Sequence, residues 1–201
     1  MHSIEALFQI LFGIFIIIMT VITVIRKLNF GIRHNSEIQE SISLLHSRLG
    51  DSKEDYHPDQ QLYEKYLADI TDSDILTAMA HDILDHCQKQ PWDITVSTVD
   101  SLGSHTAGQY VRKGGKGEII IRTGNNAYDN IILSVLIHEC MHHFLRTIDL
   151  GFEDTHKNEV LTDTTALYLG FSKYMNRGYI GVGYLSYREL LFAEKMISEA
   201  F

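Results

Sequence analysis

The sequence predicts an α+β fold in which an N-terminal transmembrane helix precedes a small domain with a short β-sheet. Three observations support this prediction. The chain begins with a long uncharged segment from Ala6 to Ile25. Short β-branched segments follow one another between residues 93 and 122, and segments with helical periodicity lie on both sides of them. With 201 residues, 45% of them hydrophobic, the chain is long enough for one domain with an appended segment.

The uncharged segment has the length and composition of a membrane-spanning helix. Gln9 is its one strongly polar residue, and a helix of this length covers about 30 Å, the thickness of the hydrocarbon core of a bilayer. The basic start and the small-residue cleavage site that are typical of a signal peptide are both missing. Arg26, Lys27 and Arg33 follow the segment, so the positive-inside rule places the N-terminus outside. We therefore expect residues 1–27 to be a single-pass anchor in the cell membrane, with the rest of the chain in the cytoplasm.

The segment after the anchor is expected to form a short helix and a linker. Over residues 36–49, apolar side chains recur at helical spacing, at Ile38, Ile42, Leu45 and Leu49. The polar residues 51–59 then predict a loop. We assign residues 28–60 to this juxtamembrane part and residues 61–201 to the domain that carries the function.

The domain itself is expected to contain a β-region between helices. A helix is predicted over residues 73–88, where one face is apolar. Three β-branched segments follow at residues 93–99, 108–113 and 118–122, and the glycine-rich residues 114–117 predict a hairpin turn between the last two. This turn does not open a helix and lacks the spacing of a phosphate-binding loop. Three more helices are predicted, over residues 129–146, 157–174 and 186–199.

The charge of the chain and its cysteines exclude some classes of function. The formal net charge is -9 and no basic stripe that could neutralise phosphates is present, so we expect no nucleic-acid partner. Cys87 and Cys140 are too few for a disulfide framework and are expected to be free, buried thiols.

The predicted helix 129–146 contains the pattern His138-Glu139-x-x-His142. Four helical residues advance about 400°, so the two histidines lie one turn apart on one face and can share one metal ion. Glu139 lies about 100° round the helix, from where its carboxylate can reach a water molecule on the metal. Zinc fits this arrangement, because it lowers the pKa of such a water towards 7 and a nearby carboxylate can then remove the proton. The pattern therefore predicts a catalytic zinc site with Glu139 as general base.

A catalytic zinc site needs a third protein ligand, which the segment after the motif can supply. Glu159 and Asp163 are four residues apart within a helical pattern and therefore share a face. We expect Glu159 to bind the metal and Asp163 to accept a hydrogen bond from the outer nitrogen of one histidine, which fixes the tautomer of that ring. His156 and Asp154 are alternative third ligands, because both residue types bind zinc.

The two motifs together resemble those of the gluzincin zinc metallopeptidases, of which thermolysin is a member. The similarity covers residues 118–175, and it rests on the His-Glu-x-x-His pattern followed by Asn158-Glu159-x-x-Thr162-Asp163. It implies Glu159 as the third ligand, Asp163 as the brace of a zinc histidine, and a zincin-like domain with an active-site helix beneath a small sheet. It also implies an edge strand that binds the substrate backbone, for which residues 117–123 are the candidate. The short separation of the motifs and the small domain would make the chain a minimal form.

Together these observations predict a membrane-anchored zinc metallopeptidase that hydrolyses peptide bonds of a protein or peptide substrate close to the membrane. No motif marks the donor that stabilises the oxyanion. Tyr184, beside a glycine, is the preferred candidate for this catalytic role, and further candidates are His105, His156, Tyr179 and Tyr187. Two alternatives remain. One is the same zinc site acting on a non-peptide amide or ester, and the other is a membrane-tethered, non-catalytic metal-binding or regulatory module with a zincin-like fold.

Overall fold

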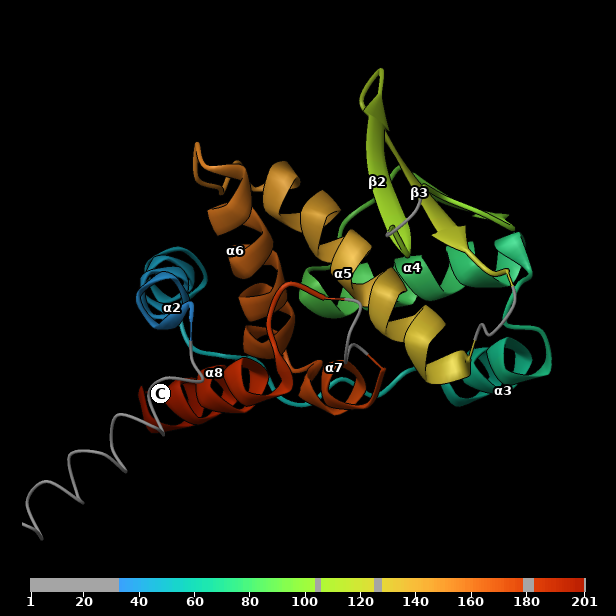
Figure 1. The fold of residues 1–201 in the computed structure, drawn as a ribbon. Coiled ribbons are helices and arrows are strands. Elements are labelled where there is room, and N and C mark those ends of the chain that lie inside the picture. Colours follow the sequence, from blue (N-terminus) through green and yellow to red (C-terminus); the bar gives the residue numbers. More distant parts are fainter. Residues whose placement is uncertain (1–32, 104–105, 125–127, 179–182, 201) are drawn as a thin grey trace, which may run out of the picture. The chain divides into compact units, whose positions relative to one another are not determined.

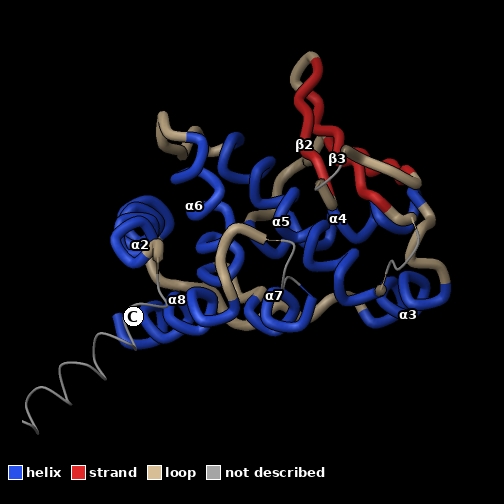
Figure 2. Tube along the Cα trace, viewed as in Figure 1, coloured by secondary structure: helices blue, strands red, loops and turns tan. Residues whose placement is uncertain are grey.

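The computed structural model of the chain describes residues 33–103, 106–124, 128–178 and 183–200. Among these residues, helices precede and follow a small sheet, as Figure 1 and Figure 2 show. The elements are α2 (Asn35–Leu49), α3 (Gln60–Ala68), α4 (Ser73–Cys87), β1 (Ile94–Val99), β2 (Gly108–Lys113), β3 (Lys116–Arg122), α5 (Asp129–Thr147), α6 (Thr155–Tyr168), α7 (Ser172–Gly178) and α8 (Tyr187–Ala200). The described part of the chain is therefore an α+β arrangement.

The sheet has three strands in the order β1-β3-β2, so β3 lies in the centre. It pairs in parallel with β1 and antiparallel with β2. The predicted hairpin between β2 and β3 is confirmed, and its turn contains Gly114 and Gly115 with φ angles of 58° and 96°. Tight hairpin turns favour such positive φ values, which glycine adopts without steric cost. Ile119 and Ile121 of β3 are fully buried, so one face of the sheet covers the core.

Helix α5 runs through the middle of the domain, with α6 on one side and the sheet and α4 on the other (Figure 1). It contacts α4, α6, α7, β2 and β3. Most of its side chains are buried, including the uncharged residues Leu136 and Ile137 before the histidine motif and Met141 within it. The helix that carries the motif is thus fixed from several sides.

Helix α2 packs against α6 and α8, and the described residues from His34 onward form one compact unit. Its predicted apolar stripe is the buried face, because Ile38, Ile42 and Leu45 have almost no exposed surface.

Two features of the helices differ from the prediction. The helix expected over residues 157–174 is two helices, α6 and α7, which are separated at Gly170 with a φ of 87°. A Cβ atom at Gly170 would overlap the carbonyl oxygen of Glu54, and Tyr56 donates its backbone N–H to the Gly170 carbonyl. The chain at residues 53–56 therefore packs where a continuous helix would have to pass. Helix α3 was not predicted from the sequence. It is capped by Asp59, which accepts a hydrogen bond from the backbone N–H of Leu62.

The prediction of a transmembrane helix requires correction. The segment expected to be the anchor, residues 1–27, lies outside the described residues. In the part of the chain that the structure describes, no helix is long and apolar enough to cross a bilayer. This finding contradicts the transmembrane fold that the sequence predicted, and with it the single-pass location in the cell membrane and the cytoplasmic placement of the domain.

Candidate metal centre

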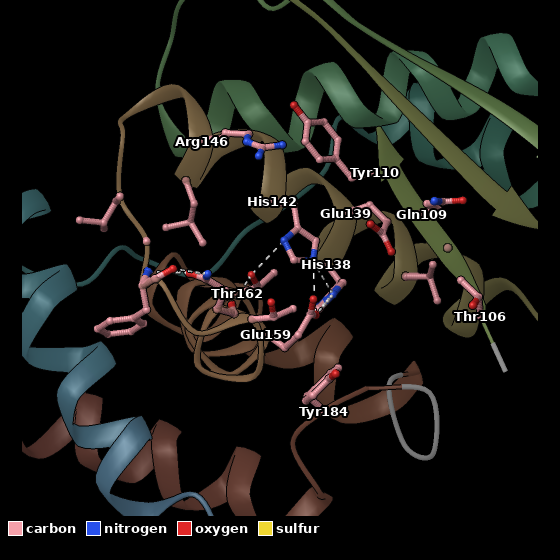
Figure 3. Close-up of a pocket in the computed structure, with 18 of the residues that line it drawn as sticks. Thr106, Gln109, Tyr110, His138, Glu139, His142, Arg146, Glu159, Thr162 and Tyr184 are labelled. Atoms are coloured by element: carbon pink, nitrogen blue, oxygen red, sulfur yellow. Dashed lines mark hydrogen bonds and ion pairs between the residues drawn. The ribbon is translucent and has the colours of Figure 1, made fainter. Parts of the chain in front are cut away.

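The two motif histidines project from α5 towards α6 and lie together, as their spacing predicts (Figure 3). The Nε2 atom of His138 is 3.1 Å from the Nε2 atom of His142. The two rings are nearly perpendicular, with an interplanar angle of 87°. His138 is buried, with 7% of its surface exposed. The rigid helical turn between the two residues therefore aims both Nε2 atoms at one point.

Glu159 supplies a third donor from α6. Its Oε2 atom is 3.2 Å from Nε2 of His138 and 3.4 Å from Nε2 of His142. A tetrahedral metal ion with bonds of about 2.1 Å holds its ligand atoms roughly 3.4 Å apart, so these spacings fit one such ion. In the described ranges, this is the one group of three or more histidine, cysteine and carboxylate residues close enough to hold a metal ion. His138, His142 and Glu159 can therefore bind a metal together.

The outer nitrogens of both histidines are held by neighbouring residues of α6. Asp163 is fully buried, and its Oδ1 lies 2.8 Å from Nδ1 of His138, as the sequence predicts. The hydroxyl of Thr162 donates to the carbonyl of Asn158 and lies 3.2 Å from Nδ1 of His142. Its oxygen can therefore accept the Nδ1 proton of His142. With the proton on Nδ1 of both rings, Nε2 is the atom of each ring that can bind the metal.

The contact of Thr162 with His142 was not predicted, although Thr162 belongs to the second motif. A local signal exists, because a helical threonine bonds back to the carbonyl four residues earlier and its hydroxyl oxygen then remains an acceptor. What the sequence does not contain is the position of α6 beside α5, which brings that oxygen to the imidazole.

Burial and neighbouring charges shift the pKa values of the ionisable groups. Burial raises the pKa of Glu139, which has 6% of its surface exposed. Burial alone would lower the pKa of His138, but its hydrogen bonds with Asp163 and Glu159 raise it to about 10. For Glu159, burial opposes ionisation, but hydrogen bonds from His138 and His142 lower its pKa to about 2. Without a metal, the carboxylates therefore hold a proton on His138.

Glu139 lies beside the metal-binding group without belonging to it. The backbone of Gly108, at the start of β2, runs directly against it. A Cβ atom at Gly108 would overlap the side chains of Val135 and Glu139. Glycine at this position therefore allows strand β2 to approach α5 closely and to cover the Glu139 carboxylate.

A cleft of about 930 Å³ opens over these residues. Its walls are the start of β2, the second half of α5 with residues 149–153, the start of α6, and Tyr184. Tyr110 and Arg146 stand on one side of the metal-binding group and Tyr184 on the other (Figure 3). Glu139 and all three potential ligands face this cleft. A bound molecule can therefore reach them.

The strand that borders the cleft is not the predicted one. Residues 117–123 were expected to be an edge strand, but they belong to β3 and its end, and β3 is the central strand. The edge strand beside the cleft is β2, and Gly108, Gln109 and Tyr110 line the cleft wall. The prediction is wrong because β1 pairs with β3 in parallel and occupies its other side.

The alternative ligands and donors lie elsewhere or outside the described residues. Asp154 caps α6 by accepting a hydrogen bond from the backbone N–H of Lys157. The ring of His156 packs against that of Tyr184, with centroids 5.3 Å apart. Tyr187 lies on α8 and does not line the cleft. His105 and Tyr179 are outside the described residues. Among the described candidates for the oxyanion donor, Tyr184 is the tyrosine that lines the cleft.

No family model, no curated protein and no solved structure matches the chain.

Proposed function

We propose that the chain is a zinc metallopeptidase that hydrolyses peptide bonds, with His138, His142 and Glu159 as zinc ligands. The single observation that carries this proposal is the combination of three converging donor atoms with a buried carboxylate, Glu139, that faces the same cleft. Two imidazoles and one carboxylate are a ligand set of catalytic zinc sites, which keep a fourth position open. The resemblance to gluzincins agrees with this set. Structural zinc sites, in contrast, use four protein ligands.

The residues of the chain can carry out the proton transfers of peptide hydrolysis. Bound zinc supplies Lewis-acid activation of a water molecule by lowering its pKa towards 7. The Glu139 carboxylate accepts the proton of the attacking water and delivers it to the leaving nitrogen of the cleaved bond. Burial raises the pKa of Glu139, which brings it closer to the working pH, where such a group transfers protons most effectively.

The edge strand β2 in the wall of the cleft favours an extended peptide as substrate. The outer edge of β2 has backbone N–H and C=O groups that a peptide can pair with, as an added strand of the sheet. Strand β2 would therefore have the substrate-binding role that was first expected of residues 117–123. Tyr184, on the far side of the zinc ligands, would donate its hydroxyl proton to the carbonyl oxygen as negative charge develops there.

The proposal is tested by metal removal and return. The purified chain should cleave unfolded proteins and quenched fluorescent peptides, and 1,10-phenanthroline should abolish the cleavage. One equivalent of zinc, added after the chelator is removed, should restore it. A chain that binds one zinc per molecule but cleaves no member of an unfolded-protein or peptide library would contradict the proposal and favour a non-catalytic metal-binding module. A library of non-peptide amides and esters distinguishes a hydrolase of another substrate class.

Zinc affinity is expected to rise with pH. The pKa of His138 is raised to about 10 by Asp163 and Glu159, so at neutral pH zinc must displace a proton from His138. The apparent dissociation constant should therefore fall about tenfold per pH unit between roughly pH 6 and 8. Calorimetry in buffers of different ionisation enthalpy should find close to one proton released per zinc. In Asp163→Asn the proton is held less strongly, so fewer protons should be released. An affinity that does not change over this pH range would contradict the prediction.

A further inference from the structure

Two buried carboxylates hold the chain directly after Tyr184. Asp163 accepts a hydrogen bond from the backbone N–H of Leu185 at 2.9 Å, and its other oxygen holds His138. Glu189 accepts hydrogen bonds from the backbone N–H of Ser186 at 2.8 Å and from its hydroxyl at 2.7 Å. The two carboxylates have 0% and 2% of their surface exposed. The segment that carries Tyr184 is therefore fixed relative to a metal-binding histidine.

One of the two Glu189 oxygens has a partner far away in the sequence. Ser186 and Glu189 have the spacing of a capping box at the start of α8, and the glutamate satisfies the backbone N–H of Ser186 as in that motif. That motif uses the Oε2 atom. The Oε1 atom lies 3.1 Å from the backbone N of His34 and 3.0 Å from its Nδ1. Capping does not need this second pair of contacts, which connects α8 to the start of α2.

The rings of His34, His156 and Tyr184 form a second connection between the start of α2 and the segment that carries Tyr184. The His34 and His156 ring centroids are 4.8 Å apart, and the His156 and Tyr184 centroids are 5.3 Å apart. Tyr184 is 46% exposed and lines the cleft. His34 thus touches the segment of Tyr184 through Glu189 and Ser186, and it supports the ring of Tyr184 through His156.

We propose that His34 and Glu189 are positioning residues that hold Tyr184 at the cleft in the orientation required for hydrolysis. This inference rests on the proposed function, because it assigns Tyr184 a task in catalysis. An exposed tyrosine ring can turn and shift with its backbone, and a displacement of about 1 Å at a reacting group can cost on the order of 100-fold in rate. Neither positioning residue lines the cleft or belongs to the three-donor group, so substituting them leaves the zinc donors in place.

A double-mutant cycle between His34 and Tyr184 tests the proposal. His34→Leu removes the Nδ1 hydrogen bond and should lower kcat about tenfold, with KM and zinc content changed less than twofold. Tyr184→Phe should lower kcat more, and His34→Leu should then have no further effect. His34→Asn, whose amide can donate to Glu189, should restore part of the rate. His46→Leu is the matched control, because His46 lies on α2, which begins directly after His34, but is paired with Tyr168. It should leave kcat unchanged.

The position of Tyr184 can also be measured without activity. In the chain labelled with 3-fluorotyrosine, the ¹⁹F resonance that Tyr184→Phe removes should shift in His34→Leu and stay in place in His46→Leu. Equal losses of kcat in both backgrounds of the cycle, or an unmoved Tyr184 resonance, would overturn the positioning role. A chain that cleaves nothing but shows the expected shift would support this role and contradict the proposed peptidase activity. If His34→Leu does not fold, Glu189→Gln, which removes the charge that the Nδ1 atom of His34 faces, provides the comparison in its place.

Discussion

Glu139→Gln is expected to abolish peptide hydrolysis while zinc stays bound. Glutamine has nearly the same shape as glutamate, so the contact with Gly108 and the approach of β2 should be kept. The amide cannot accept the proton of the attacking water, and loss of a general base costs typically 10²–10⁴-fold in rate. Because Glu139 is not one of the three converging donors, zinc affinity should change little. The measurements are kcat/KM on a quenched peptide and zinc content by mass spectrometry.

Glu153→Gln is the matched control for this variant. Glu153 is an exposed carboxylate that lines the same cleft, so its substitution removes one negative charge near the substrate without removing the base. It should retain nearly full activity. If Glu139→Gln keeps more than a tenth of the wild-type rate, Glu139 is not the base. If it loses zinc, Glu139 belongs to the ligands and the roles in the site must be reassigned.

The parts of the site that could be predicted are those fixed by one helix at a time. The angle between His138 and His142 follows from the helical repeat, and so does the common face of Glu159 and Asp163. The structure brings the two helices together so that these four side chains meet. The contact between the two helices is tertiary structure. It was expected from chemistry, because a zinc site with two histidines needs a third protein ligand and a residue that orients a histidine ring.

The strand order could not be predicted, because it depends on pairing between distant segments. The segments that form β1 and β3 both have the β-branched composition of strands. No local feature of the sequence specifies that these two pair in parallel, or that β2 pairs with the other side of β3. One weak signal was present. The segment from Glu118 to Arg122 contains three consecutive isoleucines, which is more typical of a central strand than of an edge.

Two glycines permit the close contacts of β2 and β3 with α5, and the sequence alone does not show this role. Gly108 makes room for Glu139, and Gly117 makes room for the ring of His143, which lies 3.0 Å from the hydroxyl of Tyr110 through its Nδ1. In the sequence both glycines look like turn or strand-end residues. Their role depends on which side chain of α5 faces each of them, and this is known only once the sheet is placed on the helix.

Glu159→Ala is expected to weaken zinc binding on the order of a thousand-fold, the loss of one of three protein ligands from a binding free energy of more than 10 kcal/mol. The carboxylate is the one anionic donor of the group, and its pKa, lowered to about 2 by hydrogen bonds from both histidines against the effect of burial, keeps it ionised at every working pH. Competition with a chromophoric chelator measures the affinity. Asp163→Asn should lose less, about 10- to 100-fold, because it removes the charge behind His138 and leaves all three donors in place.

Glu153→Ala is again the matched control, because Glu153 lines the cleft outside the three-donor group, and it should bind zinc as the wild type does. The decisive observation is which of the variants loses more zinc affinity. If Glu159→Ala binds stoichiometric zinc with wild-type affinity, the third ligand is another residue, and the carboxylate that lies between the two imidazoles would then serve only as their counter-ion. A loss that is larger in Asp163→Asn than in Glu159→Ala would instead mean that the buried brace, through its bonds to His138 and Leu185, organises the site more than the third donor does.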